Sequence, residues 1–157
     1  MNVDLYERIW MWTATLLLAA FVLAIVISAA VSSVHPPSHT ETIDPGVVRT
    51  ESEFARPGVV EEADGVTVVV LAELYRFTPQ TIRVPAGRPV RFRVTSPDVL
   101  HGFQVVGTNA NLVVAPGYVS ELVTEFPEPG EYLIACNEYC GLSHHLMQAK
   151  LVVEEAP

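Results

Sequence analysis

Hydrophobic residues are concentrated in one part of this chain of 157 residues. Residues 9–34 form a run of 26 residues without a charged side chain. At about 1.5 Å per residue, a helix of this length measures roughly 39 Å, enough to cross a hydrocarbon layer about 30 Å thick with some tilt. Trp10 and Trp12 lie near its start, where aromatic side chains anchor a helix at the membrane surface. The pattern predicts a transmembrane helix over residues 9–34.

A cleaved signal peptide is the alternative to this membrane anchor. The apolar region of a signal peptide spans about 7 to 15 residues and follows a basic start. The run here is longer, and the residues before it contain Arg8 together with the acidic Asp4 and Glu7. We therefore expect an uncleaved anchor, preceded by a short polar N-terminus over residues 1–8.

The next segment, residues 35–64, is rich in Pro, Glu and Thr. Its His-Pro-Pro and Asp-Pro-Gly sequences favour turns. We expect a linker on the surface with little regular structure. Its two histidines, His35 and His39, are expected to be exposed and not to bind a metal.

Short alternating runs replace the helical pattern over residues 65–157. Residues 90–94 alternate apolar and basic side chains, as a half-buried strand does. Similar runs, separated by turns with Gly or Pro, cover residues 66–74, 81–84, 101–106, 118–126, 131–135 and 148–154. Seven or eight short strands predict a β-sandwich or barrel. The expected fold class is mainly β, with one N-terminal transmembrane helix.

The chain is acidic, with eighteen acidic and nine basic residues and a net charge of −9. Nucleic-acid binding requires a basic surface, so we expect none. From residue 35 onward there are sixteen acidic and eight basic residues, a net charge of −8. This charge would attract a basic protein partner by electrostatic steering. A solvated acidic surface that keeps the protein soluble is an equally good interpretation.

Reactive side chains gather in one loop, directly before the last predicted strand. Both cysteines of the chain, Cys136 and Cys140, lie there. His144 and Met147 follow within seven residues of Cys140, and Glu138 lies between the two cysteines. Because predicted strands flank the loop on both sides, a rigid frame would hold these side chains in place.

Two thiols at this spacing allow several kinds of site. A disulfide between residues four apart would close a very small ring and contribute little stability. A thioredoxin-like site has two residues between its cysteines and lies near a βαβ pattern, whereas this loop has three. A structural zinc ion accepts two thiolates and two imidazoles, and this alternative stays open. Zinc, however, gives no role to the thioether of Met147.

Copper accounts for more of these side chains. Thiolates and thioethers suit Cu(I), and imidazole suits both oxidation states of copper. A mononuclear blue-copper site uses one cysteine, whereas two cysteines can bridge two copper ions. Each ion would then need one imidazole and one weak ligand, and His144 and Met147 would serve from the loop. His101 upstream and the backbone carbonyl of Glu138 are candidates for the other two positions.

The loop resembles the binuclear copper A loop of cytochrome c oxidase subunit II. It has the pattern Cys-x-Glu-x-Cys-Gly-x-x-His-x-x-Met, and residues 96–103, Ser-Pro-Asp-Val-Leu-His-Gly-Phe, resemble the family's first-histidine segment. The resemblance covers nearly all of residues 66–154 and the preceding span, and within the family it is to the single-span subunit of B-type haem-copper oxidases. It implies a cupredoxin-like domain with two copper ions. The implied ligands are His101, Cys136, Glu138, Cys140, His144 and Met147.

This resemblance implies an electron-transfer subunit in the cell membrane. It would accept electrons from cytochrome c or another small carrier and pass them to haem in catalytic subunit I. There, oxygen would be reduced to water and protons would be translocated. The N-terminus would lie in the cytoplasm and the copper domain on the outer, periplasmic or extracellular side. A nitric or nitrous oxide reductase with the same copper module, and a membrane-anchored copper carrier, are alternatives.

Four further residues acquire interpretations from the resemblance. A-type subunits bind a nearby magnesium ion through a glutamate at the position of Glu138, whereas B-type relatives often carry glutamine there. In B-type relatives, a glutamate placed like Glu7 marks the cytoplasmic mouth of a proton path; the alternative is an interfacial carboxylate paired with Arg8. Tyr75 and Phe77 match a segment near the face where electrons enter. They are otherwise ordinary core or rim aromatic residues.

Overall fold

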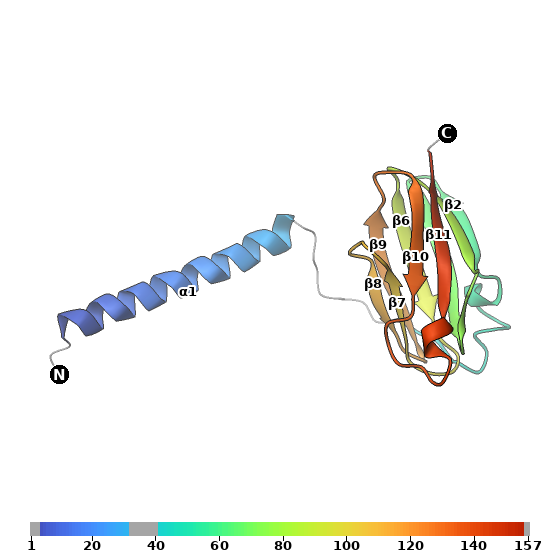
Figure 1. Cartoon of the computed structure of the whole chain (residues 1–157), viewed down its shortest axis with the longest axis horizontal. Coiled ribbons are helices and arrows are strands. Elements are labelled where there is room, and N and C mark those ends of the chain that lie inside the picture. The colour runs from blue at the N-terminus through green and yellow to red at the C-terminus, as the bar shows by residue number, and fades with distance from the viewer. Residues whose placement is uncertain (1–3, 32–40, 156–157) are drawn as a thin grey trace. The chain divides into compact units, whose positions relative to one another are not determined.

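The computed structural model describes residues 4–31 and 41–155 of the chain. It divides the chain into two compact units, Met1–His39 and Thr40–Pro157, which are described separately (Figure 1). The end of the predicted span, residues 32–34, lies outside the described residues, as do His35 and His39.

The first unit contains a single helix, α1 (Leu5–Val31). Its apolar side chains are exposed all along the helix, and its mean hydropathy reaches 2.4, so its length and composition suffice to cross a membrane. The hydroxyls of Thr13 and Thr15 each donate to the carbonyl four residues earlier, at 2.8 Å. These two polar groups are therefore satisfied within the helix, as a lipid environment requires.

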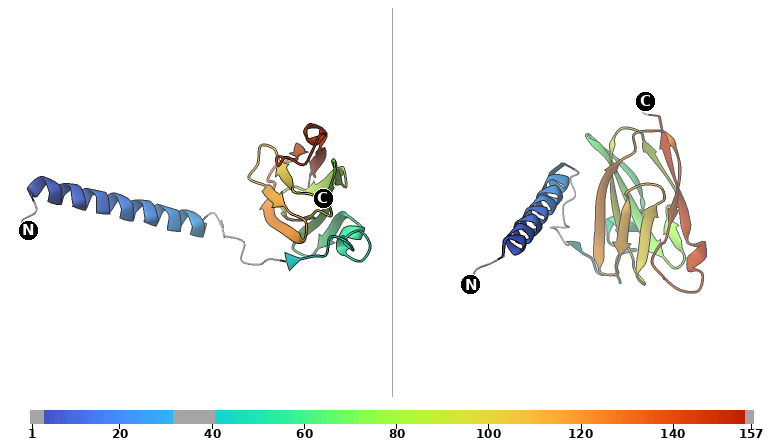
Figure 2. Two further views of the ribbon diagram at one scale, coloured as in Figure 1. Left: turned by 90° about the horizontal axis from the view of Figure 1, so that it is seen from below. Right: turned by 60° about the vertical axis from the view of Figure 1, so that its left-hand side comes forward.

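The second unit is a sandwich of two β-sheets (Figure 1, Figure 2). In spatial order, the first sheet contains β1 (Glu41–Thr42), β9 (Tyr118–Glu125), β6 (Pro89–Thr95), β3 (Gly65–Glu73) and β2 (Gly58–Glu62), and β4 (Arg76–Thr78) pairs with β3. The second sheet contains β5 (Thr81–Pro85), β11 (Gln148–Glu154), β10 (Gly130–Ala135), β7 (His101–Val105) and β8 (Asn111–Val114). The β3–β6 and β5–β11 pairs are parallel. This architecture confirms the predicted mainly β sandwich.

Phenylalanine rings fill the space between the two sheets. In β6, Phe92 and its apolar neighbours two residues away are buried, as the alternating sequence pattern predicts. The ring of Phe92 lies 5.2 Å from that of Phe103 and 6.3 Å from that of Phe126, between centroids. Phe77 meets Phe103 edge to face at 5.6 Å. The core thus joins the two sheets through rings from β4 and β6 on one side and from β7 on the other.

The outer face of β3 explains why the segment before it is folded. Every residue of β3 is buried, including Val69 and Leu71, which belong to a second apolar cluster with Val48 and Phe54. The segment expected to be an irregular linker therefore supplies β1, β2 and the short 3₁₀ helix η1 (Glu53–Ala55) to the folded unit. Because β3 is apolar on both faces, a covering layer removes the second face from water.

Arg93 joins several parts of this outer layer. Its guanidinium pairs with Glu41 at 2.9 Å, Glu53 at 2.6 Å and Glu121 at 2.9 Å. Burial disfavours the charged form, but the hydrogen bonds that Arg93 donates to Glu53, Glu41 and Glu121 outweigh it and raise the pKa of Arg93 above its usual range. Arg93 thus connects β6 with β1, η1 and β9.

We expect the Arg93→Met substitution to lower the free energy of unfolding by about 1–2 kcal/mol, because it leaves three carboxylates without their shared partner. Urea denaturation of the full chain measures this change. Arg83→Met is the matched control, since among the described residues Arg83 pairs only with Glu154, and the two side chains are 63% and 52% exposed. It should cost less than about 0.5 kcal/mol, and equal losses in the two variants would contradict the bridging role.

Candidate metal centre

Three strands position the side chains of the candidate site. His101 is the first residue of β7, and Cys136 follows the last residue of β10. Strands β10 and β11 pair up to Ala135, and the Cys136 N–H donates to the Met147 carbonyl at 3.2 Å, which closes the base of the loop. Because β7 pairs antiparallel with β10, the start of β7, at His101, faces this loop. The loop lies at the end of the sandwich opposite the end of β11 (Figure 1).

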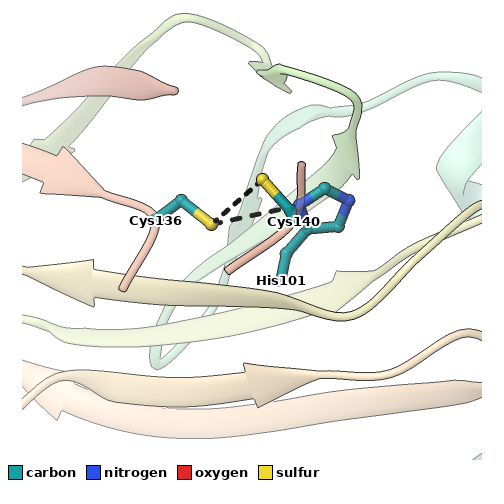
Figure 3. Close-up of side chains that lie close together, drawn as sticks. All are labelled: His101, Cys136 and Cys140. Carbon is teal, nitrogen blue, oxygen red and sulfur yellow. Dashed lines mark hydrogen bonds between the residues drawn. The ribbon is translucent and has the colours of Figure 1, made fainter. Parts of the chain in front are cut away.

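The two sulfurs lie at the middle of the site. Cys136 Sγ is 3.9 Å from Cys140 Sγ and 4.0 Å from His101 Nδ1 (Figure 3). The metal-binding atoms of these three residues all lie within 4.8 Å of one another. Both cysteines are free thiols. The sulfurs therefore face each other as two separate donors.

The remaining donors from the loop surround the same two sulfurs. Cys140 Sγ lies 3.5 Å from His144 Nδ1 and 3.8 Å from Met147 Sδ. Cys136 Sγ lies 3.2 Å from the backbone oxygen of Glu138. Each sulfur thus has one imidazole and one weak donor beside it. All six residues proposed from the sequence come together here, with Glu138 contributing its backbone carbonyl.

Most of this site is shielded from water. His101 is fully buried, Met147 is 3% exposed and each cysteine is 7% exposed, whereas His144 is half-buried. Burial, reinforced by the neighbouring Cys136, raises the pKa of Cys140 to about 11. The Cys140 thiol thus stays protonated at neutral pH, and a bound metal ion must displace its proton.

The donor chemistry of the site fits copper. Two thiols and a thioether are soft donors suited to Cu(I), and the two imidazole Nδ1 atoms serve either oxidation state. The donors also fall into two sets, one around Cys136 and one around Cys140. Each sulfur thus has its own imidazole and its own weak donor.

Gly102 allows β7 to approach the loop, a role that the sequence analysis missed. A Cβ atom at Gly102 would lie 1.9 Å from the side-chain oxygen of Asn137 and 2.9 Å from its backbone nitrogen. The Asn137 amide in turn donates to Asn111 Oδ1 on β8 at 3.1 Å. A glycine inside a strand pattern is the signal for such a close approach.

A carboxylate lies behind His101, and it too was missed. Asp98 Oδ1 is 2.9 Å from His101 Nε2, on the opposite side of the ring from Cys136. Burial raises the pKa of Asp98, but the hydrogen bond with His101 and bonds from backbone N–H groups outweigh it and lower the pKa below its usual range. Asp98 is therefore ionised at neutral pH. Its spacing of three residues before the histidine was visible in the sequence.

The other sequence-predicted residues lie in different settings. Phe77 is fully buried in the core, whereas Tyr75 is half-buried and its hydroxyl lies against Gly141 of the loop. Glu7 is exposed in the first turn of α1. The electron-transfer role of Tyr75 and Phe77, the proton role of Glu7 and magnesium binding by Glu138 stay predictions.

Exposed apolar side chains project from the loop itself. Tyr139 is 76% exposed, Leu142 is 89% exposed and Leu146 is 64% exposed. The Tyr139 ring lies 5.8 Å from the ring of His144. We call these three residues the apolar rim. Exposed apolar groups of this kind are typical of contact surfaces.

Comparison with known proteins places the chain among oxidase subunits. A family model described as cytochrome c oxidase subunit II, periplasmic domain, matches residues 68–156. The chain is 41% identical over 155 residues to a cytochrome c oxidase subunit 2 of Thermus thermophilus, covering 96% of this chain and 92% of the relative.

Solved structures agree with this match. A chain in the structure of a haem-copper terminal oxidase dimer superposes with a TM-score of 0.72 at 30% identity, covering 95% of this chain and 99% of that one. The periplasmic domain of subunit II of the Bradyrhizobium japonicum cytochrome oxidase superposes with a TM-score of 0.54 at 21% identity, covering 61% of this chain and 88% of that domain. These likenesses confirm the predicted cupredoxin-like fold.

Proposed function

Because the chain belongs to the cytochrome c oxidase subunit II family, we propose that it is the subunit through which electrons reach the haem of a membrane oxidase. As a subunit of a haem-copper oxidase, it works with a catalytic partner subunit. The observation that carries the proposal is the pair of buried free thiols, each beside one imidazole and one weak donor. This donor set suits a carrier of single electrons.

Six residues would hold two copper ions in this subunit: His101, Cys136, the Glu138 carbonyl, Cys140, His144 and Met147. When bound, the copper pair supplies one-electron oxidation and reduction. The chain supplies rigidity, because strands β7, β10 and β11 hold both ends of the ligand segments. Burial of the donors also limits their movement and the access of water. Both features favour fast electron transfer with little rearrangement.

The electron donor would be cytochrome c or another small carrier. The apolar rim lies on the loop that carries the candidate ligands, and its Tyr139 contacts the His144 ring. A donor seated there would approach the site without crossing the sandwich. The net charge of −8 beyond residue 34 would steer a basic carrier toward this domain. From the site, electrons would pass to haem in subunit I, where oxygen reduction is coupled to proton translocation.

The proposed setting is the cell membrane. Residues 1–8 would lie in the cytoplasm, the helix predicted over residues 9–34 would span the lipid, and residues 65–157 would face the outside. The apolar helix α1 and the family match to a periplasmic domain support this orientation. Residues 41–62 would form part of the outer domain, since they contribute β1, η1 and β2.

Purification of the tagged full chain from its native membranes tests the function. A haem-bearing subunit should copurify, and the complex should consume oxygen when supplied with reduced cytochrome c. A complex that instead reduces nitric or nitrous oxide, and leaves oxygen untouched, would support the reductase alternative. A chain that copurifies with no haem subunit and releases its copper readily would support a copper carrier, although the burial of its ligands opposes such exchange.

We further propose that Glu7 takes up protons at the cytoplasmic side. It is exposed in the first turn of α1, where a carboxylate can bind and release protons. The Glu7→Gln substitution should slow oxygen consumption by the assembled complex about tenfold or more, without changing the copper spectrum. Asp4→Asn is the matched control because Asp4 is exposed next to the same helix. Full activity of the Glu7→Gln complex would dismiss this role.

Met147 provides a test of the weak ligand. Its sulfur lies 3.8 Å from Cys140 Sγ, and the residue is 3% exposed. Met147→Leu preserves the buried volume but removes the thioether. We expect both copper ions to remain bound while the reduction potential shifts, because weak axial ligands tune it. Voltammetry measures the shift, Met11→Leu in α1 is the control, and an unchanged potential would remove Met147 from the ligand set.

A further inference from the structure

We propose that Asp98 is a positioning residue that fixes the ring of His101 and aligns it with the cysteine loop. The inference rests on the proposed role of His101 as a copper ligand. It assigns a function to a side chain that lies beside the donor set and contributes no donor atom to it.

The two nitrogens of His101 face different partners. Nδ1 faces Cys136 Sγ at 4.0 Å, and Nε2 faces Asp98 Oδ1 at 2.9 Å. A carboxylate at Nε2 favours the tautomer with its proton on that nitrogen, which leaves the Nδ1 lone pair directed toward the sulfurs. His101 is fully buried, so water does not take the place of Asp98. The carboxylate thus selects both the tautomer and the ring orientation that a metal ion needs.

Asp98 itself is held by several donors. Oδ2 accepts a hydrogen bond from the Leu74 N–H at 2.9 Å, and Oδ1 accepts one from the Val99 N–H at 2.7 Å. The Ser96 hydroxyl lies 3.1 Å from the same Oδ1. These bonds engage both oxygens and restrict rotation of the carboxylate. A fixed acceptor can define the position of a histidine ring more narrowly than a mobile one.

The Asp98 carboxylate also binds the connection between β3 and β4, which packs against the cysteine loop. Leu74, which donates to Asp98 Oδ2, precedes Tyr75 in the connection between β3 and β4. A Cβ atom at Gly141 would lie 2.6 Å from the Tyr75 hydroxyl oxygen, so this connection packs directly on the residue after Cys140. Asp98 therefore ties the β7 ligand to the segment against which the loop rests. It sets the position of His101 relative to the two sulfurs.

This arrangement has an electronic consequence. A carboxylate that accepts a hydrogen bond from the Nε2–H group makes the imidazole a stronger donor and places a negative charge near the metal site. Both effects favour the oxidised state of a bound metal. Asp98→Asn keeps the size of the side chain but removes the charge, and Asp98→Ala also removes the acceptor. We expect the reduction potential of the copper-loaded chain to rise in both variants.

Nitrogen-15 NMR of the metal-free full chain in detergent tests the positioning role without copper. We expect the His101 Nε2 proton to exchange with water about tenfold faster or more in Asp98→Ala, because this variant loses one hydrogen bond to a charged group. A smaller acceleration is expected in Asp98→Asn. Ser96→Ala removes one contact of Asp98 and leaves the Asp98–His101 pair intact, so it should accelerate the exchange less than either Asp98 variant does.

The copper-loaded chain provides the second readout. Asp44→Asn is the matched control for charge, since Asp44 is an exposed aspartate that accepts from the Gly46 N–H. The reduction potential should rise in Asp98→Asn and stay constant in Asp44→Asn. If the His101 Nε2 proton exchanges at the same rate in the Asp98 variants as in Asp44→Asn, the inference is overturned. If Asp98→Ala does not fold, the results for Asp98→Asn alone decide whether Asp98 positions His101.

Failure of the proposed function would be visible separately. A wild-type chain that binds no copper pair would reject the electron-transfer proposal, and the exchange rate of the metal-free chain would still decide whether Asp98 fixes the His101 ring.

Discussion

The Cys136→Ser and Cys140→Ser substitutions are each expected to abolish the two-copper spectrum of the full chain. Each sulfur lies beside one imidazole, and the two lie 3.9 Å from each other, so both ions would depend on both thiolates. A serine hydroxyl is a hard and poor ligand for Cu(I). We expect complete loss of the intense sulfur-to-copper absorption, measured after copper reconstitution, and retention of at most one copper ion.

His145→Gln is the matched control for these cysteine variants. His145 is an exposed neighbour of the proposed ligand His144, so its replacement should leave the spectrum and the copper content unchanged. A wild-type spectrum in either cysteine variant would reject the bridging role of the two sulfurs.

Adding one methyl group at Gly102 should have the second-largest effect. In Gly102→Ala, the new Cβ would meet the side chain of Asn137 and, at 2.9 Å, its backbone nitrogen. Because a backbone atom cannot rotate away, the cysteine loop must move relative to β7. Overpacking of this kind costs about 1–3 kcal/mol. We expect a matching loss of stability in thermal unfolding and weakened copper binding, since His101 and Cys136 would separate.

Two companion variants make this test specific. Gly58→Ala on β2 introduces the same methyl group where nothing lies within 4 Å, so it should leave copper binding unchanged. Asn137→Ala should not rescue Gly102→Ala, because the clash with the backbone nitrogen remains. Full copper affinity in Gly102→Ala would show that β7 and the loop do not need their close approach.

Local patterns in the sequence predicted the elements that have strong periodicity. The uncharged run over residues 9–34 identified the helix, and alternation over residues 90–94 identified β6. The sequence pattern did not predict the short strands β4 and β8, because three or four residues show too little alternation to be distinguished from a turn. The segment before β3 was taken for a linker because the valine run of β3 does not show that a second layer covers its outer face.

The candidate site was predictable to a similar degree. The order and spacing of Cys136, Cys140, His144 and Met147 identified the ligand-rich loop, because a loop bound at both ends by strands must bring such neighbours together. The partnership of Asp98 with His101 and the approach of Gly102 to Asn137 depend on how β7 faces the loop. The spacing of Asp98 from His101 and the glycine in the strand were visible in the sequence, but neither shows which residues of the loop β7 faces.

The most direct test of the central claim is the metal content of the purified full chain after copper reconstitution, determined together with its electron paramagnetic resonance spectrum. The account predicts two copper ions per chain that share a single unpaired electron. One metal ion per chain, or a chain whose cysteines are joined to each other in the active complex, would contradict it.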